Sequence, residues 1–233
     1  MVGDAVTRWF ETPAGRARLA HDEEVARHHQ PGLRYEAGAD GAPHLVGVVR
    51  IVTVSGIPHE IGTTIEFPEG YPIDEPLAFE VGTRFPHDPD HHFFQDTQRV
   101  CLWLDVASRW RPHDPDALAE FITELGTFYY RLLQMESNPG MPFPGPSFAH
   151  GWNPAYREHL AQVLRMAPGQ IPRMRHALAG NLARRAWCPC RSNRRYEHCH
   201  RDVVGQFRSR MSPERLRNLI ADLRGDSGTL MPS

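Results

Sequence analysis

The chain of 233 residues contains no lysine, so arginine supplies all 26 of its Lys/Arg positions. A lysine-type isopeptide adduct cannot form on this chain, because there is no ε-amine to attack an activated carboxyl group. If the protein modifies itself, we expect the acceptor to be the N-terminal amine or a hydroxyl.

Long apolar runs and targeting signals are also missing. No stretch approaches the ~20 apolar residues that cross a bilayer, and the N-terminus lacks the basic start and apolar core of a signal peptide. Four cysteines, three of them crowded together, do not make the framework of a disulfide-rich secreted protein. The composition is ordinary for a soluble globular protein. We expect a cytoplasmic protein with no membrane partner.

Charge is distributed unevenly along the chain. Residues 1–150 carry 11 Arg against 22 Asp or Glu, a net −11, whereas residues 151–233 carry 15 against 6, a net +9. One interpretation is two differently solvated surfaces. The other is a basic tail that meets an acidic partner such as nucleic acid. We favour the first, because the arginines of the tail are scattered and largely unaccompanied by aromatic residues.

The sequence pattern of the first half of the chain is that of an α+β domain. Thr12 and Pro13 are suited to begin a helix over residues 12–30, and β-branched runs bounded by Asp40-Gly41 and Ser55-Gly56 indicate an antiparallel meander. The predicted strands are 33–37, 44–54, 60–67 and 77–81. Helix followed by meander predicts an α+β fold.

The second half reads as an irregular segment, helices and a small tail. Residues 82–114 have few regular signals and hold the lone Cys101, and an irregular segment of that length favours a functional role. Apolar spacing predicts a helix near 115–135 whose inner face carries Leu118, Phe121, Ile122, Leu125, Phe128, Tyr129 and Leu132. Further helices are expected near 154–166, near 173–186, where the sequence is basic, and near 213–224, where it is amphipathic. The sequence Pro168-Gly169-Gln170-Ile171-Pro172 suggests a boundary, which gives a first domain of residues 1–167 and a tail of residues 168–233.

The tail contains a pattern typical of a metal site. Cys188 and Cys190 form one close pair, Cys199 and His200 form the other, and eight residues between the pairs let the chain return on itself. Four thiolate or imidazole ligands suit tetrahedral Zn²⁺, and a closed set of four protein ligands suggests a structural ion. A tail this small has little core of its own, so a metal would supply stability. The alternative is a set of unligated surface cysteines.

This pattern, over residues 188–200, resembles the SEC-C motif, a small zinc knuckle at the tail of the SecA translocase and of many bacterial proteins. Arg191-Ser192-Asn193 replaces the usual Gly-Ser-Gly of the turn. The resemblance implies zinc and protein interaction, and no particular reaction.

A second resemblance covers roughly residues 10–165. An ordered set of short elements carries it: Tyr71-Pro72 with Pro76, His91 ten residues before Cys101, Val100-Cys101-Leu102, Trp110-Arg111-Pro112, Leu132-Leu133 and Ser137-Asn138-Pro139. This set is similar to the ubiquitin-conjugating (UBC-like) fold, which has an N-terminal helix, a four-stranded antiparallel meander, an active-site loop and C-terminal helices. Its layout is nearest to bacterial members found in ubiquitin-like conjugation and CBASS-type antiphage operons. Pro76 comes one residue later than in that family.

The resemblance implies that Cys101 is a catalytic thiol. It would accept, as a thioester, the C-terminus of a ubiquitin-like protein or of a cGAS-like nucleotidyltransferase. No Gly-rich nucleotide loop is present, so a separate activating enzyme would supply the activated donor. His91 matches the family's histidine, and we expect it to shape the loop by bonding to the backbone. Without the resemblance, Cys101 would read as a small buried apolar residue.

The chain departs from the family at one chemically important place. Phe93 stands where the family has the asparagine credited with stabilising the oxyanion. His92, Gln95, Asn138 or backbone N–H groups are candidate replacements, and Asp105 could orient an incoming amine. Two readings follow: a conjugating-type transferase acting through Cys101, and an inactive UBC-like module that only grips a partner protein. A nucleic-acid-associated protein acting through the basic tail is a third.

Overall fold

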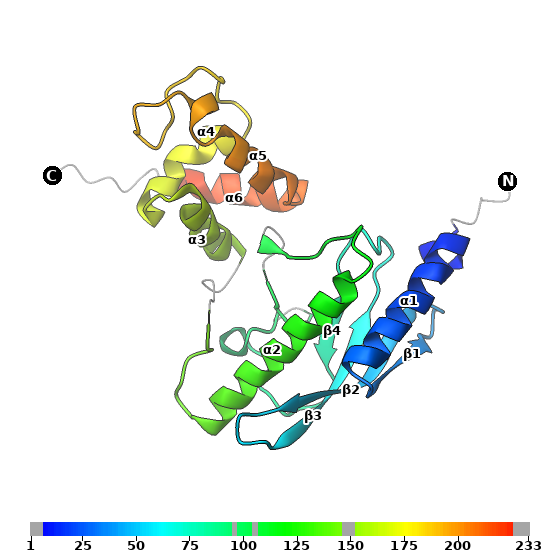
Figure 1. Ribbon diagram of the computed structural model, residues 1–233. Coiled ribbons are helices and arrows are strands. Elements are labelled where there is room, and N and C mark those ends of the chain that lie inside the picture. Colours follow the sequence, from blue (N-terminus) through cyan, green and yellow to red (C-terminus); the bar gives the residue numbers. More distant parts are fainter. Residues whose placement is uncertain (1–6, 95–96, 104–106, 146–151, 226–233) are drawn as a thin grey trace. The chain divides into compact units, whose positions relative to one another are not determined.

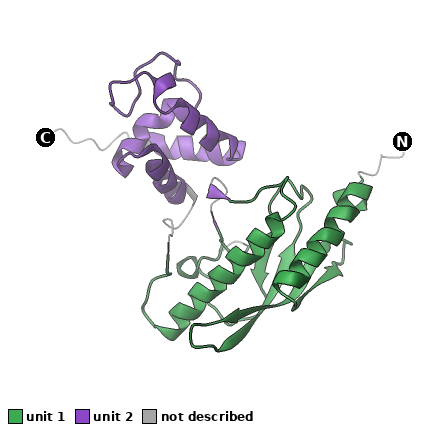
Figure 2. Ribbon diagram, in the orientation of Figure 1, with its two compact units in different colours: residues 1–102, 109–145 green, residues 103–108, 146–233 purple. Residues whose placement is uncertain are grey.

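The computed structural model describes residues 7–94, 97–103, 107–145 and 152–225. These fall into two compact units, shown in different colours in Figure 2. The first comprises the described parts of 1–102 and 109–145, and the second those of 103–108 and 146–233. No helix among the described residues combines the length and apolar character needed to cross a membrane.

The first unit is an α+β domain built on a four-stranded antiparallel sheet, as predicted (Figure 1). The strands follow the order β1-β2-β3-β4. Its elements are η1 (Trp9–Glu11), α1 (Pro13–His29), β1 (Leu33–Ala37), β2 (Pro43–Val52), β3 (Pro58–Glu66), β4 (Leu77–Glu80), η2 (Pro89–His91) and α2 (Ala117–Ser137).

Tight turns set the register of the meander. Gly41 and Gly56 adopt φ values of 79° and 77°, in the left-handed region that glycine enters without a steric penalty. The register then pairs Leu45 with Ile65 across β2 and β3, and both are buried. One face of the sheet therefore supplies the core, as a period of two along a half-buried strand requires.

Helix α2 covers this apolar face, and α1 packs beside it (Figure 1). The helix confirms the predicted inner face, whose residues are all buried: Leu118, Phe121, Ile122, Leu125, Phe128, Tyr129 and Leu132. Their recurrence every three or four positions aligns them along one side of the helix. In α1 the Thr12 hydroxyl accepts a hydrogen bond from Gly15 N at 3.0 Å, which confirms the predicted cap.

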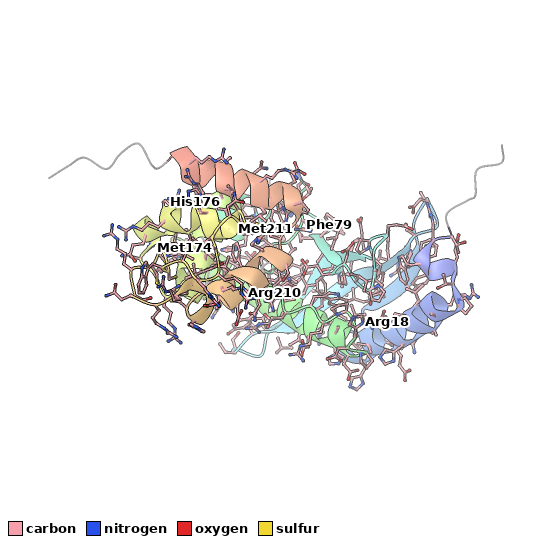
Figure 3. The ribbon with its side chains drawn as sticks, turned by 90° about the horizontal axis from the view of Figure 1, so that it is seen from above. Arg18, Phe79, Met174, His176, Arg210 and Met211 are labelled. Atoms are coloured by element: carbon pink, nitrogen blue, oxygen red, sulfur yellow. The ribbon has the colours of Figure 1, made fainter. Side chains whose placement is uncertain are left out.

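The second unit is helical and has its own core. Its elements are α3 (Trp152–Leu164), η4 (Pro168–Met174), α4 (Arg175–Leu178), η5 (Tyr196–His198), α5 (Arg201–Ser209) and α6 (Pro213–Gly225). The core includes Tyr156 of α3, Met174 of η4 and Phe207 of α5, and Figure 3 labels Met174 within this unit.

The division between the units differs from the boundary expected at 167/168. Helix α3 precedes that boundary, yet its residues Tyr156 and Leu160 are fully buried in the core of the second unit. The Pro168–Pro172 segment resembles a linker in sequence, but it forms a 3-10 helix that buries Ile171 in the same core. Apolar residues inside a Pro/Gly-rich stretch thus make it part of a fold.

The helix predicted over 173–186 is wrong beyond residue 178. The α-helix α4 spans only Arg175–Leu178, and Gly180 follows with a φ of 78°, a left-handed conformation typical of helix ends. Residues 183–186 then turn toward the cysteine cluster.

Candidate functional site

Cys101 lies within the irregular segment between β4 and α2. Val100 N donates to Ala78 O of β4 at 2.8 Å, and Cys101 N donates to His92 O at 2.8 Å. An isolated bridge also pairs Phe93 with Val100. The backbone N–H groups of Val100 and Cys101 are therefore bonded to the sheet and to the preceding loop, and the Cys101 side chain remains partly exposed.

The surroundings of Cys101 disfavour its thiolate. Burial raises the pKa of the Cys101 thiol to about 11; the positive charge of Arg99 acts in the opposite direction, and the negative charge of Glu75 adds to the rise. Desolvation penalises the charged form of the sulfur more than one guanidinium compensates. At neutral pH the group is a thiol that must lose its proton before it can act as a nucleophile.

Phe93, at the position of the family's asparagine, is a core residue. Its side chain is 2% exposed, and its ring stacks on His87 at a centroid distance of 4.4 Å and meets Phe128 edge-on at 5.7 Å. An aromatic ring held this way offers no amide N–H to an oxyanion. The departure seen in the sequence is thus a packed structural feature.

The loop histidines bond to carboxylates. His91 Nδ1 lies 2.7 Å from Asp88 Oδ1, and the same oxygen accepts from His91 N at 3.0 Å. His91 therefore shapes the loop, with Asp88 as its partner where a backbone bond was expected. Partial burial acts to raise the pKa of the Asp88 carboxyl, but the hydrogen bonds from His91 outweigh it and hold that pKa below its usual value. His87 Nε2 lies 2.5 Å from the buried Glu80 Oε2, so His87 and His91 hold different carboxylates.

The candidate replacements for the oxyanion donor have different surroundings. The Asn138 side-chain amide donates to Gln134 O at 2.8 Å, which commits it to the end of α2. His92 has a left-handed backbone with a φ of 60°, and its ring lies 4.1 Å from that of Phe143. Gln95 and Asp105 lie outside the described residues.

A buried polar cluster, not foreseen from the sequence, ties the Tyr-Pro element to α1. Arg18 on α1 (Figure 3) donates to both oxygens of Asp22 at 3.0 and 2.8 Å, and Tyr71 OH donates to Asp22 Oδ2 at 2.5 Å. Burial raises the pKa of Asp22, and its hydrogen bonds with Arg18 and Tyr71 oppose that rise. Trp110 Nε1 donates to Pro72 O at 2.9 Å, so two of the family-like elements meet beside this cluster. The i,i+4 spacing of Arg18 and Asp22 on a predicted helix was the available signal.

The second unit brings the four predicted ligands together. The ligand atoms of Cys188, Cys190, Cys199 and His200 all lie within 4.8 Å of one another. His200 Nδ1 is 3.2 Å from Cys188 Sγ and 3.3 Å from Cys199 Sγ, and Cys190 Sγ is 3.6 Å from Cys199 Sγ. A tetrahedral ion with bonds of about 2.3 Å to sulfur and 2.0–2.1 Å to nitrogen separates its ligands by roughly 3.5–3.8 Å. The four side chains therefore could hold a metal ion.

A backbone contact orients the histidine of this cluster. His200 Nε2 lies 3.0 Å from Leu164 O, at the end of α3. A carbonyl can only accept, so Nε2 carries the proton and donates it, which leaves the Nδ1 lone pair facing the thiols. Metal-binding histidines are commonly held by such an outer hydrogen bond.

The thiols of the cluster share their protons unequally. Burial raises the pKa of the Cys188 thiol to about 12. Burial also raises that of Cys190, but hydrogen bonds from the Ser192 hydroxyl and backbone N–H outweigh it and lower the pKa of Cys190 to about 6. At neutral pH the thiolate form of Cys190 is therefore favoured, whereas a bound metal ion would have to displace the proton of Cys188.

No family model matches the chain, and no curated protein matches it. Among solved structures, the chain is similar to the yeast vps23 UEV domain, solved in complex with a vps27 PSDP peptide. The two share 16% identity over 59% of this chain and 86% of that one, with a TM-score of 0.36. A likeness at this TM-score carries no argument about function.

Proposed function

We propose that the first unit is a UBC-like acyl carrier, in which Cys101 accepts the C-terminus of a ubiquitin-like protein or of a cGAS-like nucleotidyltransferase. The position of Cys101 in the fold is the observation that supports this proposal. It is a partly exposed thiol within the irregular segment between β4 and α2, and the backbone N–H groups of Val100 and Cys101 are hydrogen-bonded in place. The order of helix, antiparallel meander, irregular segment and helix also fits this proposal. We also propose that this acyl carrier acts in bacterial antiphage defence.

The reaction would be acyl transfer to sulfur. The Cys101 thiolate attacks the carbonyl carbon of an activated C-terminus, either an acyl-adenylate or a thioester on an activating enzyme. A carbon–sulfur bond forms, and the bond from that carbon to the adenylate oxygen or the donor sulfur breaks, with the electron pair leaving on the departing group. The thiol proton passes to solvent or to the leaving group.

The raised pKa of Cys101 has a consequence for such a carrier. Few molecules are thiolates at neutral pH, but a thiolate of high pKa is intrinsically more nucleophilic and is a poorer leaving group. A thioester on Cys101 would form slowly without help and then persist. This behaviour suits a carrier that waits for its acceptor.

Intact-mass spectrometry tests this proposal. The protein would be isolated from its native host with the neighbouring genes expressed, at mildly acidic pH without reductant. We expect a protein-sized adduct on the wild type that thiol removes, a thiol-resistant oxyester on Cys101→Ser, and no adduct on Cys101→Ala. Absence of any adduct with ATP and the neighbouring genes present would count against an enzyme.

A second candidate function is a UBC-like module that grips a partner protein without catalysis. The observation that favours it is Phe93, whose buried ring occupies the position of the missing oxyanion donor. If the protein is such a module, the wild type and Cys101→Ala should capture the partner protein equally well. The variant should also retain the biological function of the wild type in the host. Loss of activity in Cys101→Ala with partner capture intact would favour the acyl carrier.

We further propose that Zn²⁺ occupies the four-ligand cluster as a structural ion. Three thiolates and one imidazole match its preferred donors, and the bond between His200 and Leu164 supplies the orientation such a site needs. The ion would join the turn of residues 188–200 to α3. Elemental analysis should find one zinc per chain in the wild type and none in Cys199→Ala, whereas Cys101→Ala should retain it.

A further inference from the structure

The four-ligand cluster folds a short basic segment back on itself. Residues 184–188 run antiparallel to residues 194–197, and Cys188 N donates to Arg194 O at 2.9 Å. An isolated bridge pairs Trp187 with Arg195 inside this arrangement. We call these two segments the basic ladder.

Side chains along the basic ladder alternate between buried and exposed positions. Successive side chains of extended backbone point to opposite faces. Cys188 and Tyr196 are buried in the core of the second unit, so their neighbours Trp187 and Arg195 point away from it. Trp187 is 61% exposed, and the guanidinium carbon of Arg195 lies 4.0 Å from the centroid of its ring.

The segment of the chain that contains this tryptophan is strongly basic. Residues 184–197 contain five arginines and one acidic residue, a net +4. All five arginines are exposed. Glu197 is half-buried and lies 3.8 Å from Arg184. Arg185, Arg191 and Arg194 form no ion pair within the part of the chain that the structure describes. Their charge is therefore available to a partner.

An exposed tryptophan on a strongly basic pair of segments suits one ligand chemistry. Guanidinium groups bind phosphates with a matched fork of donors, and an aromatic face stacks on a nucleobase. Bases of a duplex are already stacked on one another, whereas those of a single strand are free to leave their neighbours. An acidic peptide would satisfy the charges but would offer no π-face to Trp187.

We propose that the basic ladder is a binding surface for single-stranded nucleic acid. Trp187 stacks on a base, and the arginines on either side of it contact the flanking phosphates. This function is separate from the acyl chemistry proposed for Cys101. It also revises the view that the tail arginines are scattered: the turn at the cysteine cluster brings four of them onto two adjacent segments around one tryptophan.

Fluorescence anisotropy of the full chain, with labelled oligouridylate, oligothymidylate and a duplex of the same length, tests the proposal. We expect both single strands to bind more tightly than the duplex. Trp187→Ala should weaken single-strand binding about tenfold, the loss typical of one stacked base. Trp187→Phe should restore most of it. Tighter binding of oligouridylate would identify RNA as the natural ligand, and equal or weaker binding would leave the surface as a general or DNA-preferring one.

The arginines are tested by salt dependence with a matched control. Arg194→Ala should reduce the slope of log affinity against log salt by about 0.7, the contribution of one single-strand phosphate contact. Arg217→Ala removes the same charge from an exposed position on α6, outside the basic ladder, and should leave affinity and slope nearly unchanged. Metal content should be equal in all variants.

Several results would overturn the proposal. They are an absence of binding at low salt, duplex binding as tight as single-strand binding, and full affinity in Trp187→Ala. Equal losses in Arg194→Ala and Arg217→Ala would mean that diffuse charge accounts for the binding. A polyglutamate peptide that binds as tightly as the oligonucleotides would identify an acidic protein as the partner instead.

Discussion

The two units differ in the kind of polar centre that joins their elements. In the first, Arg18, Asp22 and Tyr71 form a buried hydrogen-bonded cluster between α1 and the segment after β3. In the second, three thiols and an imidazole converge from the turn of residues 188–200, and His200 bonds to the end of α3. The first centre is held by hydrogen bonds between protein atoms. The second brings four candidate ligand atoms within 4.8 Å of one another and could hold a metal ion.

The thiols show the same difference. Burial raises the pKa of the Cys101 thiol to about 11, and the charge of Arg99 only partly opposes that rise. Cys190 is also desolvated, yet hydrogen bonds from Ser192 outweigh the burial and lower its pKa to about 6. The surroundings thus keep the Cys101 thiol protonated and favour the thiolate form of Cys190. The surroundings of each sulfur, more than its exposure, separate the two roles.

Removal of the metal should have the largest effect. Structural zinc contributes about 10–16 kcal/mol in small zinc domains, and the total stability of a unit this size is about 5–15 kcal/mol. We therefore expect chelation, or Cys199→Ala, to unfold the second unit while the first keeps its own thermal transition. Calorimetry combined with metal analysis would measure this. If both transitions survive in metal-free protein, the cluster is not what holds the second unit together.

Disruption of the buried cluster should destabilise the first unit and leave the second unit unchanged. Asp22→Ala leaves Arg18 and Tyr71 without their shared acceptor, so we expect a loss of about 3–5 kcal/mol in the free energy of unfolding of the first unit. Denaturant titration should show the transition of the second unit unchanged.

Glu23→Ala is the matched control for this prediction. Glu23 is the next residue on α1 and forms an exposed pair with Arg27, worth about 0–1 kcal/mol. Equal losses in the two variants would mean that the buried cluster adds nothing beyond a surface ion pair.

Much of this architecture was predictable from local patterns. The apolar spacing of α2 and the Asp40-Gly41 and Ser55-Gly56 turns indicate the helix and the meander directly, because periodicity and positive φ are local properties. The cluster of four candidate metal ligands was predictable for a similar reason, since each pair of donors is close in sequence and only eight residues separate the two pairs. Local reasoning failed at Gly180, where a glycine in a basic helical pattern ended the helix.

The parts that sequence reasoning missed depend on distant contacts. Nothing near Asp22 in the sequence announces Tyr71 as its partner, since the two are brought together only by the fold. Proline and glycine in the Pro168–Pro172 segment predict a domain boundary, but Ile171 packs into the core of the second unit. The role of Phe93 likewise became visible only through its contacts with His87 and Phe128.

Alkylation of Cys101 sharpens the comparison between the thiols. With a pKa of about 11, about one molecule in a thousand carries the Cys101 thiolate at pH 8. Because the raised pKa keeps the proton on sulfur, the rate should climb about tenfold per pH unit from pH 8 to 10 and level off only near pH 11.

Peptide mass spectrometry after a timed iodoacetamide pulse on metal-loaded protein would follow this rate at Cys101 alone. Cys101→Ala supplies the blank for modification elsewhere. A plateau by pH 9 would show that the surroundings do not suppress the thiolate, and the contrast with the cluster thiols would then rest on metal binding only.

Ser192 offers the finest test of the contrast, because its hydroxyl lies 3.1 Å from Cys190 Sγ and 3.3 Å from Cys199 Sγ. A hydrogen bond of this kind stabilises sulfur in its anionic, metal-binding form, and its loss elsewhere weakens metal affinity about 10–100-fold. We expect Ser192→Ala to fall at the lower end, near tenfold, because Ser192 is exposed and water can replace its hydroxyl. Competition with a chelator of known zinc affinity would measure the change. Ser209→Ala is the control, since that hydroxyl bonds to Gln206 O within α5 and touches no ligand. Equal zinc affinity in Ser192→Ala and Ser209→Ala would mean that the positions of the four ligands, without help from the turn between them, determine how tightly the cluster holds its ion.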